Sequence, residues 1–195
     1  RACHNCFDCS HCEAHAKFVA AAQARGLLAA QPGKVPVAGF DMPDDRLYHR
    51  GHTWVRDEGD GTLTIGLDDL ASRLTGVPDA VTLPEPGARL VTNGIAWRAR
   101  KNGVEARVLA PVDGEGVETG GPAEGWYLKV RPAEGASLAH LLEPREARVW
   151  LLREFERLQL AMSTPEMVPT LADGGVPVDG IARNLDREQW DRIVK

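Results

Sequence analysis

The sequence contains no apolar run of the roughly 18 residues that a membrane-spanning helix needs, and no signal-peptide pattern. It also lacks an excess of positive charge, because 23 Lys and Arg residues face 28 Asp and Glu residues and the net charge is −5. Neutralising a nucleic acid backbone requires a basic face, so we expect no nucleic acid partner. The expected localisation is the cytoplasm. Because the sequence starts at Arg1, membrane association through an upstream anchor stays open.

Recognisable enzyme motifs are absent as well. The sequence has no nucleophile elbow, phosphate-binding loop, dinucleotide fingerprint or zinc-protease helix. His49, His52 and His140 have no neighbour in sequence that identifies a catalytic triad, and we interpret His49 and His52 as structural. With 43% hydrophobic and 26% charged residues, the composition is that of a globular protein. We therefore expect a folded protein that is not an enzyme.

All four cysteines lie within the first 12 residues. Cys3, Cys6, Cys9 and Cys12 are each separated by two residues, and His15 follows three residues later. Because Cys-x-x-Cys turns can direct two thiolates at one ion, the array predicts a metal site for zinc or an iron–sulfur cluster. The spacing departs from the bacterial ferredoxin pattern, since the fourth cysteine comes one residue early and no proline follows it. Two disulfides or four free thiols are the alternatives.

Short β-prone runs separated by turn residues occupy the middle of the chain, from about residue 47 to residue 130. Gly59-Asp60-Gly61 separates two alternating runs and predicts a hairpin. Asp68 is the expected N-cap of a short helical turn that continues to Leu74. This succession of short strands is typical of a β-sandwich or a small barrel.

The clearest local signal is Asn102-Gly103, because both central residues of a type I′ turn need positive φ. The turn predicts the following register: Lys101 with Val104, Arg100 with Glu105, Ala99 with Ala106, Arg98 with Arg107, and Trp97 with Val108. One face of this hairpin should then be apolar and the other charged.

The charged face of the hairpin should form a local basic patch on an acidic protein. We expect Arg100 and Glu105 to attract each other, whereas Arg98 opposite Arg107 places two like charges together. The patch is either an ordinary solvated strand face or a docking site for an acidic partner surface. The candidate partner-binding residues are Arg98, Arg100, Lys101 and Arg107.

Six segments of the middle region, taken in order, resemble the glycine cleavage system H protein family. They are His52-Thr53-Trp54-Val55, Thr62-Leu63-Thr64-Ile65-Gly66-Leu67, Asp69-Leu70-Ala71, Leu83-Pro84-Glu85-Pro86-Gly87, Ala110-Pro111-Val112-Asp113-Gly114-Glu115 and Glu124-Gly125-Trp126-Tyr127-Leu128-Lys129-Val130. The resemblance covers roughly residues 45–132. It implies a lipoyl-domain-like sandwich whose hairpin presents a lipoyl-lysine, which carries an aminomethyl group between the partner enzymes of glycine decarboxylation.

The sequence departs from the family at the attachment position itself. Family members carry the lysine within a segment similar to Glu-Ser-Val-Lys-Ala, eight residues before a proline. That proline corresponds to Pro111 in this sequence, so the residue at the lysine position is Gly103. The acidic residue normally three positions earlier is Arg100. Lys101 lies two residues from the expected position, so we expect no lipoate, and Lys101 is the remaining candidate for lipoylation in a shifted register.

Helical spacing returns towards the C-terminus. Leu151, Phe155, Leu158 and Met162 recur at the period of a helix and predict an amphipathic helix that starts near Pro144. A final short helix with Trp190 on one side is also expected.

The expected fold class is mainly β with flanking helices: a lipoyl/biotinyl-like flattened β-sandwich, or barrel-sandwich hybrid, with a cysteine-rich N-terminal segment and C-terminal helices. The expected organisation is a Cys-rich segment and short helix over 1–30, a linker over 31–44, the H-protein-like domain over 45–132 and a helical extension over 133–195. The leading functional hypothesis is a non-catalytic scaffold subunit that binds other subunits of a multi-component complex and holds a metal at its N-terminus. The alternatives are an electron-transfer component with an iron–sulfur cluster, and a lipoyl carrier modified at Lys101.

Overall fold

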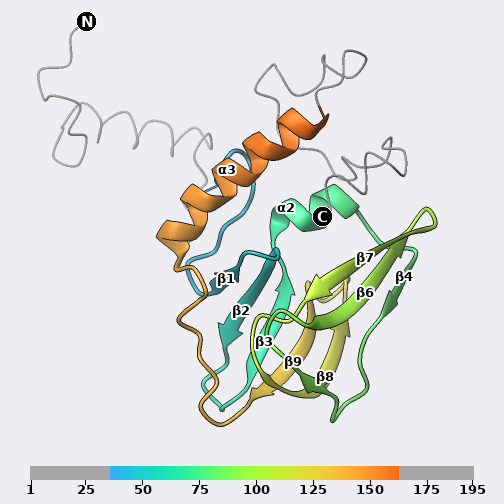
Figure 1. The fold of residues 1–195 in the computed structure, drawn as a ribbon, viewed down its shortest axis with the longest axis vertical. Coiled ribbons are helices and arrows are strands. Elements are labelled where there is room, and N and C mark those ends of the chain that lie inside the picture. Colours follow the sequence, from blue (N-terminus) through green and yellow to red (C-terminus); the bar gives the residue numbers. More distant parts are fainter. Residues whose placement is uncertain (1–35, 163–195) are drawn as a thin grey trace, which may run out of the picture. The chain divides into compact units, whose positions relative to one another are not determined.

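The computed structural model describes residues 36–162, which belong to one of the two units into which contacts divide the chain, Lys34–Lys195. The described residues form strands and two helices (Figure 1). The strands are β1 (Leu47–His49), β2 (Thr53–Asp57), β3 (Leu63–Leu67), β4 (Ala80–Thr82), β5 (Arg89–Leu90), β6 (Ile95–Lys101), β7 (Val104–Leu109), β8 (Gly114–Gly121) and β9 (Trp126–Pro132). The helices are α2 (Asp69–Thr75) and α3 (Pro144–Met162).

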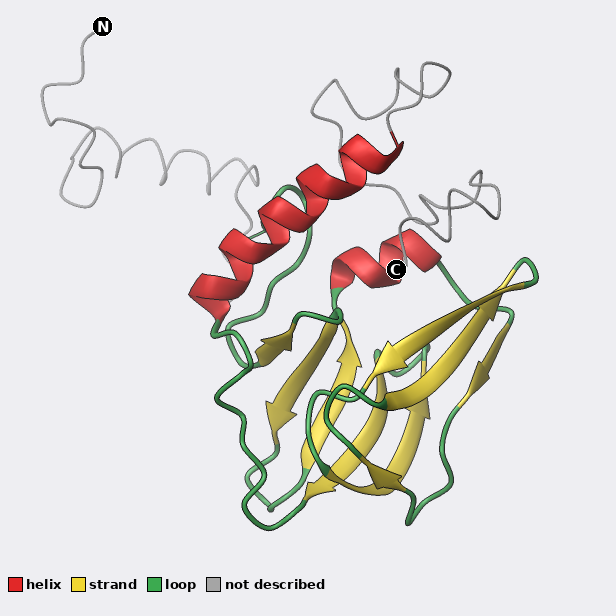
Figure 2. Cartoon of the chain, viewed as in Figure 1, coloured by secondary structure: helices red, strands yellow, loops and turns green. Residues whose placement is uncertain are grey.

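The strands form two antiparallel sheets. The larger sheet has the order β1-β2-β3-β9-β8-β5, and the smaller has the order β4-β6-β7. Figure 2 shows both helices at one end of the strands. The described part of the chain is therefore mainly β with helices beside the sheets, as the sequence predicts.

One hydrophobic core lies among the strands. Trp97 of β6 stacks on Tyr127 of β9, with ring centroids 4.9 Å apart and planes 15° from parallel. Ile65 of β3 and Leu128 of β9 are fully buried beside them. Alternation of inward apolar and outward polar residues along these strands produces this core.

A second core joins α3 to the segment that precedes β1. Phe40 and Met42 are fully buried in it together with Leu151 of α3, and the Phe40 and Phe155 rings meet edge to face at 5.2 Å. The sequence interpretation places residues 31–44 in a linker, and it did not anticipate that Phe40 and Met42 are buried against a helix a hundred residues away.

The predicted local elements are confirmed where the structure describes them. Gly59 and Gly61 have positive φ in the β2–β3 hairpin, and α3 begins at Pro144 with Leu151 and Leu158 buried. The short helix after the cysteine array and the final helix with Trp190 lie outside residues 36–162. Neither helix within that range is long and apolar enough to cross a bilayer.

Candidate functional site

The β6–β7 hairpin ends in the two-residue turn that the sequence predicts. Asn102 and Gly103 have φ values of 50° and 78°, as a type I′ turn requires. All five predicted cross-strand pairs, from Lys101 with Val104 to Trp97 with Val108, are confirmed. Residue 103 at the tip is therefore a glycine with no side chain to modify.

Lys101 lies at the edge of the turn and its ammonium group is engaged. Its Nζ donates to the carbonyl oxygen of Val77 at 2.5 Å and lies 3.3 Å from a carboxylate oxygen of Asp79. The other oxygen of Asp79 accepts the amide of Asn102 at 2.7 Å. These hydrogen bonds hold the pKa of Asp79 below its usual value. The loop before β4 thus holds the Lys101 side chain and the Asn102 amide through Val77 and Asp79.

The charged face of the hairpin is arranged differently from the expectation. Glu105 pairs diagonally with Arg98 at 2.5 Å and lies 3.7 Å from Arg107. Arg100 lies opposite Glu105 across the two strands, as predicted, but among the described residues the ion pairs of Glu105 are with Arg98 and Arg107. The Glu105 carboxylate lies between the guanidinium groups of Arg98 and Arg107 and therefore reduces the repulsion between them. This face of the hairpin still carries a net positive charge.

The apolar face of the same hairpin borders a cavity of about 570 Å³. Ala106 and Val108 of β7 line one side, α2 contributes Leu70 and Leu74, and α3 contributes Leu158. Residues of α2, α3 and the hairpin all line it, and Figure 1 shows α2 between α3 and the hairpin. The sequence did not predict this cavity, because its walls come from segments up to a hundred residues apart.

His52 and Asp68 meet at the edge of this cavity. The β2–β3 register puts Thr53 opposite Leu67, so the next pair outward is His52 and Asp68. The Asp68 amide donates to the His52 carbonyl at 2.9 Å, and Nδ1 of His52 lies 2.8 Å from Oδ2 of Asp68. Oδ1 of Asp68 accepts the amide of Ala71 at 2.8 Å, which confirms the predicted N-cap. One buried carboxylate therefore links the β hairpin to α2.

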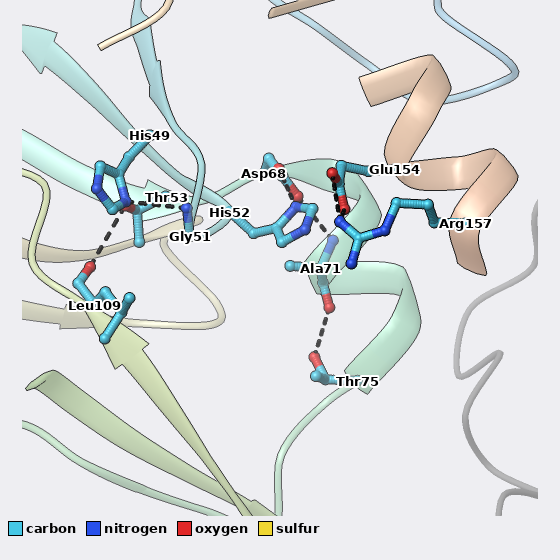
Figure 3. Close-up of polar contacts among 10 residues, drawn as sticks. All are labelled: His49, Gly51, His52, Thr53, Asp68, Ala71, Thr75, Leu109, Glu154 and Arg157. Carbon is cyan, nitrogen blue, oxygen red and sulfur yellow. Dashed lines mark hydrogen bonds and ion pairs between the residues drawn. The ribbon is translucent and has the colours of Figure 1, made fainter. Parts of the chain in front are cut away.

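The surroundings of His52 favour its charged form. Burial disfavours the imidazolium, but the charge of Asp68 and the hydrogen bond to it outweigh burial and raise the pKa of His52 above its usual 6.5. The ring is packed against Trp150 of α3, with centroids 5.0 Å apart. Figure 3 shows the ring lying between Asp68 and the ion pair of Glu154 with Arg157. His52 thus joins α2 and α3 through Asp68 and Trp150.

Replacing His52 with glutamine should destabilise the protein more at low pH than at high pH. Since the folded-state pKa of His52 is raised, its stabilisation by Asp68 is complete below the unfolded value of 6.5 and is lost as the pH rises through the folded value. Urea unfolding of wild type and His52→Gln at about pH 6 and about pH 9 measures this difference. An equal loss of stability at the two pH values would contradict a charged His52.

The two other histidines of the described region have structural partners. His49 accepts the amide of Gly51 through Nδ1 at 3.0 Å, which leaves Nε2 to donate to Oδ1 of Asn93 at 3.0 Å. Burial, together with the nearby His140, lowers the pKa of His49, so the neutral ring suits this arrangement. His140 lies 2.9 Å from the carbonyl oxygen of Pro111. These contacts fit the structural interpretation of His49.

The predicted metal ligands cannot be located in this structure. Cys3, Cys6, Cys9, Cys12 and His15 lie outside the described residues. Within residues 36–162, no three His, Cys, Asp or Glu side chains gather closely enough to hold a metal ion.

Comparisons with known proteins match the central β region. The family model "Glycine cleavage H-protein" matches residues 46–121. The glycine cleavage system H protein of Idiomarina loihiensis is 30% identical over 116 residues, which cover 53% of this chain and 90% of the relative. The protein of the same name from Escherichia coli O7:K1 gives the same identity and coverage. A crystal structure of a glycine cleavage system H protein from Mycobacterium marinum is 24% identical, with a TM-score of 0.49, over 56% of this chain and 98% of that one. Because the relatives match along nine-tenths of their own length, this chain belongs to the glycine cleavage system H protein family.

Proposed function

We propose that this chain is a non-catalytic docking subunit of the H-protein family that carries no lipoate and binds other protein subunits of a multi-component complex. The observation that carries the proposal is the tip of the β6–β7 hairpin, where Asn102 and Gly103 make the turn and no lysine is present. The nearest amine, on Lys101, is occupied by the Val77 carbonyl and Asp79. Lipoylation of Lys101 would have to break both contacts.

The basic face of the hairpin is the proposed docking surface. Arg98, Arg100 and Arg107 project from one face of two paired strands, with Glu105 as the acidic residue among them. Arg107 keeps 65% of its side-chain surface exposed. Exposed charges of one sign on a rigid hairpin attract an acidic surface and orient it. The partner should therefore present carboxylates to this face of the β6–β7 hairpin.

Removing this charge should weaken binding of the partner. We expect Arg98→Gln/Arg100→Gln/Arg107→Gln to reduce affinity about tenfold at low salt, since each exposed ion pair contributes up to about 1 kcal/mol. The assay uses interferometry with a subunit that co-purifies with the chain from its own source and has been isolated. Arg131→Gln, an exposed cation on β9, is the matched control and should bind like wild type. Equal affinities of the triple variant and the wild type would contradict docking through the basic face of the hairpin.

The N-terminal array is the second part of the proposal. Four cysteines at two-residue spacing and His15 supply thiolate and imidazole ligands of the kind that zinc prefers, and the thiolates also suit an iron–sulfur cluster. Elemental analysis of protein purified without oxygen should find zinc or iron, and Cys6→Ser should lower the metal content. A metal-free chain lighter than its sequence mass by four hydrogen atoms would contradict this part and indicate two disulfides.

A further inference from the structure

The outer side of α3, which faces away from the second core, carries two apolar residues. Ala147, Leu151 and Leu158 are buried on the inner side of the helix. Val149 and Leu152 lie on the opposite side, where they keep 53% and 44% of their surface exposed. Figure 2 shows α3 at the edge of the described residues, with the sheets and α2 on one side of it. Two neighbouring apolar side chains of a surface helix are thus available for contact.

A charged residue lies beyond each end of this apolar pair, on the same side of the helix. Residues 145, 149, 152 and 156 are spaced by four, three and four positions, which aligns their side chains along one helix face. Arg145 and Glu156, at the two ends, are both exposed. Neither has an ion pair with another residue in the range 36–162. We call Arg145, Val149, Leu152 and Glu156 the outer stripe of α3.

The outer stripe is complementary to itself. Arg145 and Glu156 lie equally far from the midpoint of the stripe, and so do Val149 and Leu152. A two-fold axis at this midpoint, perpendicular to the helix, places a second copy of α3 antiparallel to the first. Val149 of each copy then faces Leu152 of the other, and Arg145 faces Glu156. A parallel pair of helices would instead oppose like charges at both ends.

The residues beside the outer stripe fit the same antiparallel arrangement. Glu146 and Arg153 are exposed on one flank of the stripe, and the two-fold axis brings Glu146 of one copy near Arg153 of the other. On the other flank, Arg148 is already paired with Asp44 of its own chain. The flanks therefore add opposite charges to the contact and no unpaired like charges.

We propose that α3 joins two copies of this chain in an antiparallel dimer through the outer stripe. Val149 and Leu152 of the two copies pack against each other, and an ion pair of Arg145 with Glu156 closes each end. A single pair of helices buries less than the roughly 1,200 Å² of a standard interface, so the dimer is weak and reversible. The dimer does not use the basic face of the β6–β7 hairpin, and it is independent of the docking proposal.

Sedimentation velocity of the full chain, from about 10 µM to about 1 mM, tests the proposal. The mass should rise reversibly from that of one chain to that of two, with a Kd of about 100 µM. Leu152→Glu places a charge in both apolar contacts and should weaken the dimer at least about tenfold. Val77→Glu is the matched control, since Val77 is exposed outside α3, and it should dimerise like the wild type. Thermal unfolding checks that each variant is folded. A wild-type chain that stays monomeric over this range, or a Leu152→Glu chain that dimerises like the wild type, overturns the proposal.

Charge reversal tests the antiparallel register. Arg145→Glu and Glu156→Arg each turn both end contacts into contacts of like charge, so each should weaken the dimer about tenfold at low salt. Arg145→Glu/Glu156→Arg exchanges the two charges and should restore the wild-type Kd. An equimolar mixture of the two single variants should form mixed dimers, because every end contact between them again joins opposite charges. A double variant that dimerises as weakly as either single variant would overturn the antiparallel pairing.

Discussion

Asp68→Ala is expected to lower the free energy of unfolding by about 3 kcal/mol. The side chain of Asp68 is 1% exposed, and its two oxygens have separate partners, the amide of Ala71 and Nδ1 of His52, each at 2.8 Å. Losing an N-cap costs about 1 kcal/mol. Removing one partner of a buried ion pair costs about 3–5 kcal/mol. The His52 ring is 30% exposed, so water can partly replace the carboxylate and the combined loss lies at the lower end. Urea unfolding at about pH 6, where His52 is charged, measures the effect.

Asp68→Asn separates the two roles of this carboxylate. Asparagine is as good an N-cap as aspartate, so it preserves the bond to Ala71 while it removes the charge that faces His52. Its loss should be roughly half that of Asp68→Ala at about pH 6 and should shrink as the pH rises through the raised folded-state pKa of His52. A loss below about 1 kcal/mol for Asp68→Ala would show that Asp68 does not join the hairpin to α2.

Arg100→Glu/Gly103→Lys is expected to make the β6–β7 hairpin a substrate for lipoylation. The double variant introduces a lysine at position 103 and an acidic residue at position 100, which are the hairpin positions where the resemblance to the H-protein family implies them. A Cβ built on Gly103 has no heavy atom within 4 Å, so the lysine meets no steric obstacle. Its φ of 78° costs a non-glycine residue about 1–2 kcal/mol, which is local to the turn.

Incubation with a lipoate-attaching enzyme, lipoate and ATP, followed by intact-mass analysis, measures the gain. Wild type should stay unmodified and the double variant should acquire one lipoyl group. Lys101→Arg in the double-variant background is the control, and it should leave the modification intact. An unmodified double variant would mean that the missing tip residues are not what prevents attachment.

The elements that the sequence predicted well are those specified by residues close together in the chain. Asn102-Gly103 fixes the β6–β7 turn because glycine and asparagine tolerate positive φ, and the register of the strands follows from the turn length. Asp68 identifies the start of α2 because its side chain caps an amide three residues later. The apolar period of α3 identifies its buried face, with Leu151 and Leu158 inside.

The site itself depends on contacts that local patterns do not encode. The ion pair of His52 with Asp68 follows from the β2–β3 register, and it could have been found by extending the predicted hairpin one pair beyond Thr53 and Leu67. The packing of Trp150 on His52 has no such local signal. The cavity depends on the packing of α3 near the hairpin, which local patterns do not specify. The ion pairs on the hairpin depend on side-chain rotamers, and the rotamers of Glu105 and Arg98 bring these two residues together diagonally.

The most direct test of the central claim is the intact mass of the protein purified from its own source, with peptide mapping across the β6–β7 hairpin. The account predicts that the peptide containing Lys101 has its unmodified mass in every preparation. A lipoyl amide on Lys101 would contradict it, because the hairpin would then carry lipoate two residues from the family's attachment position and would not be only a docking surface.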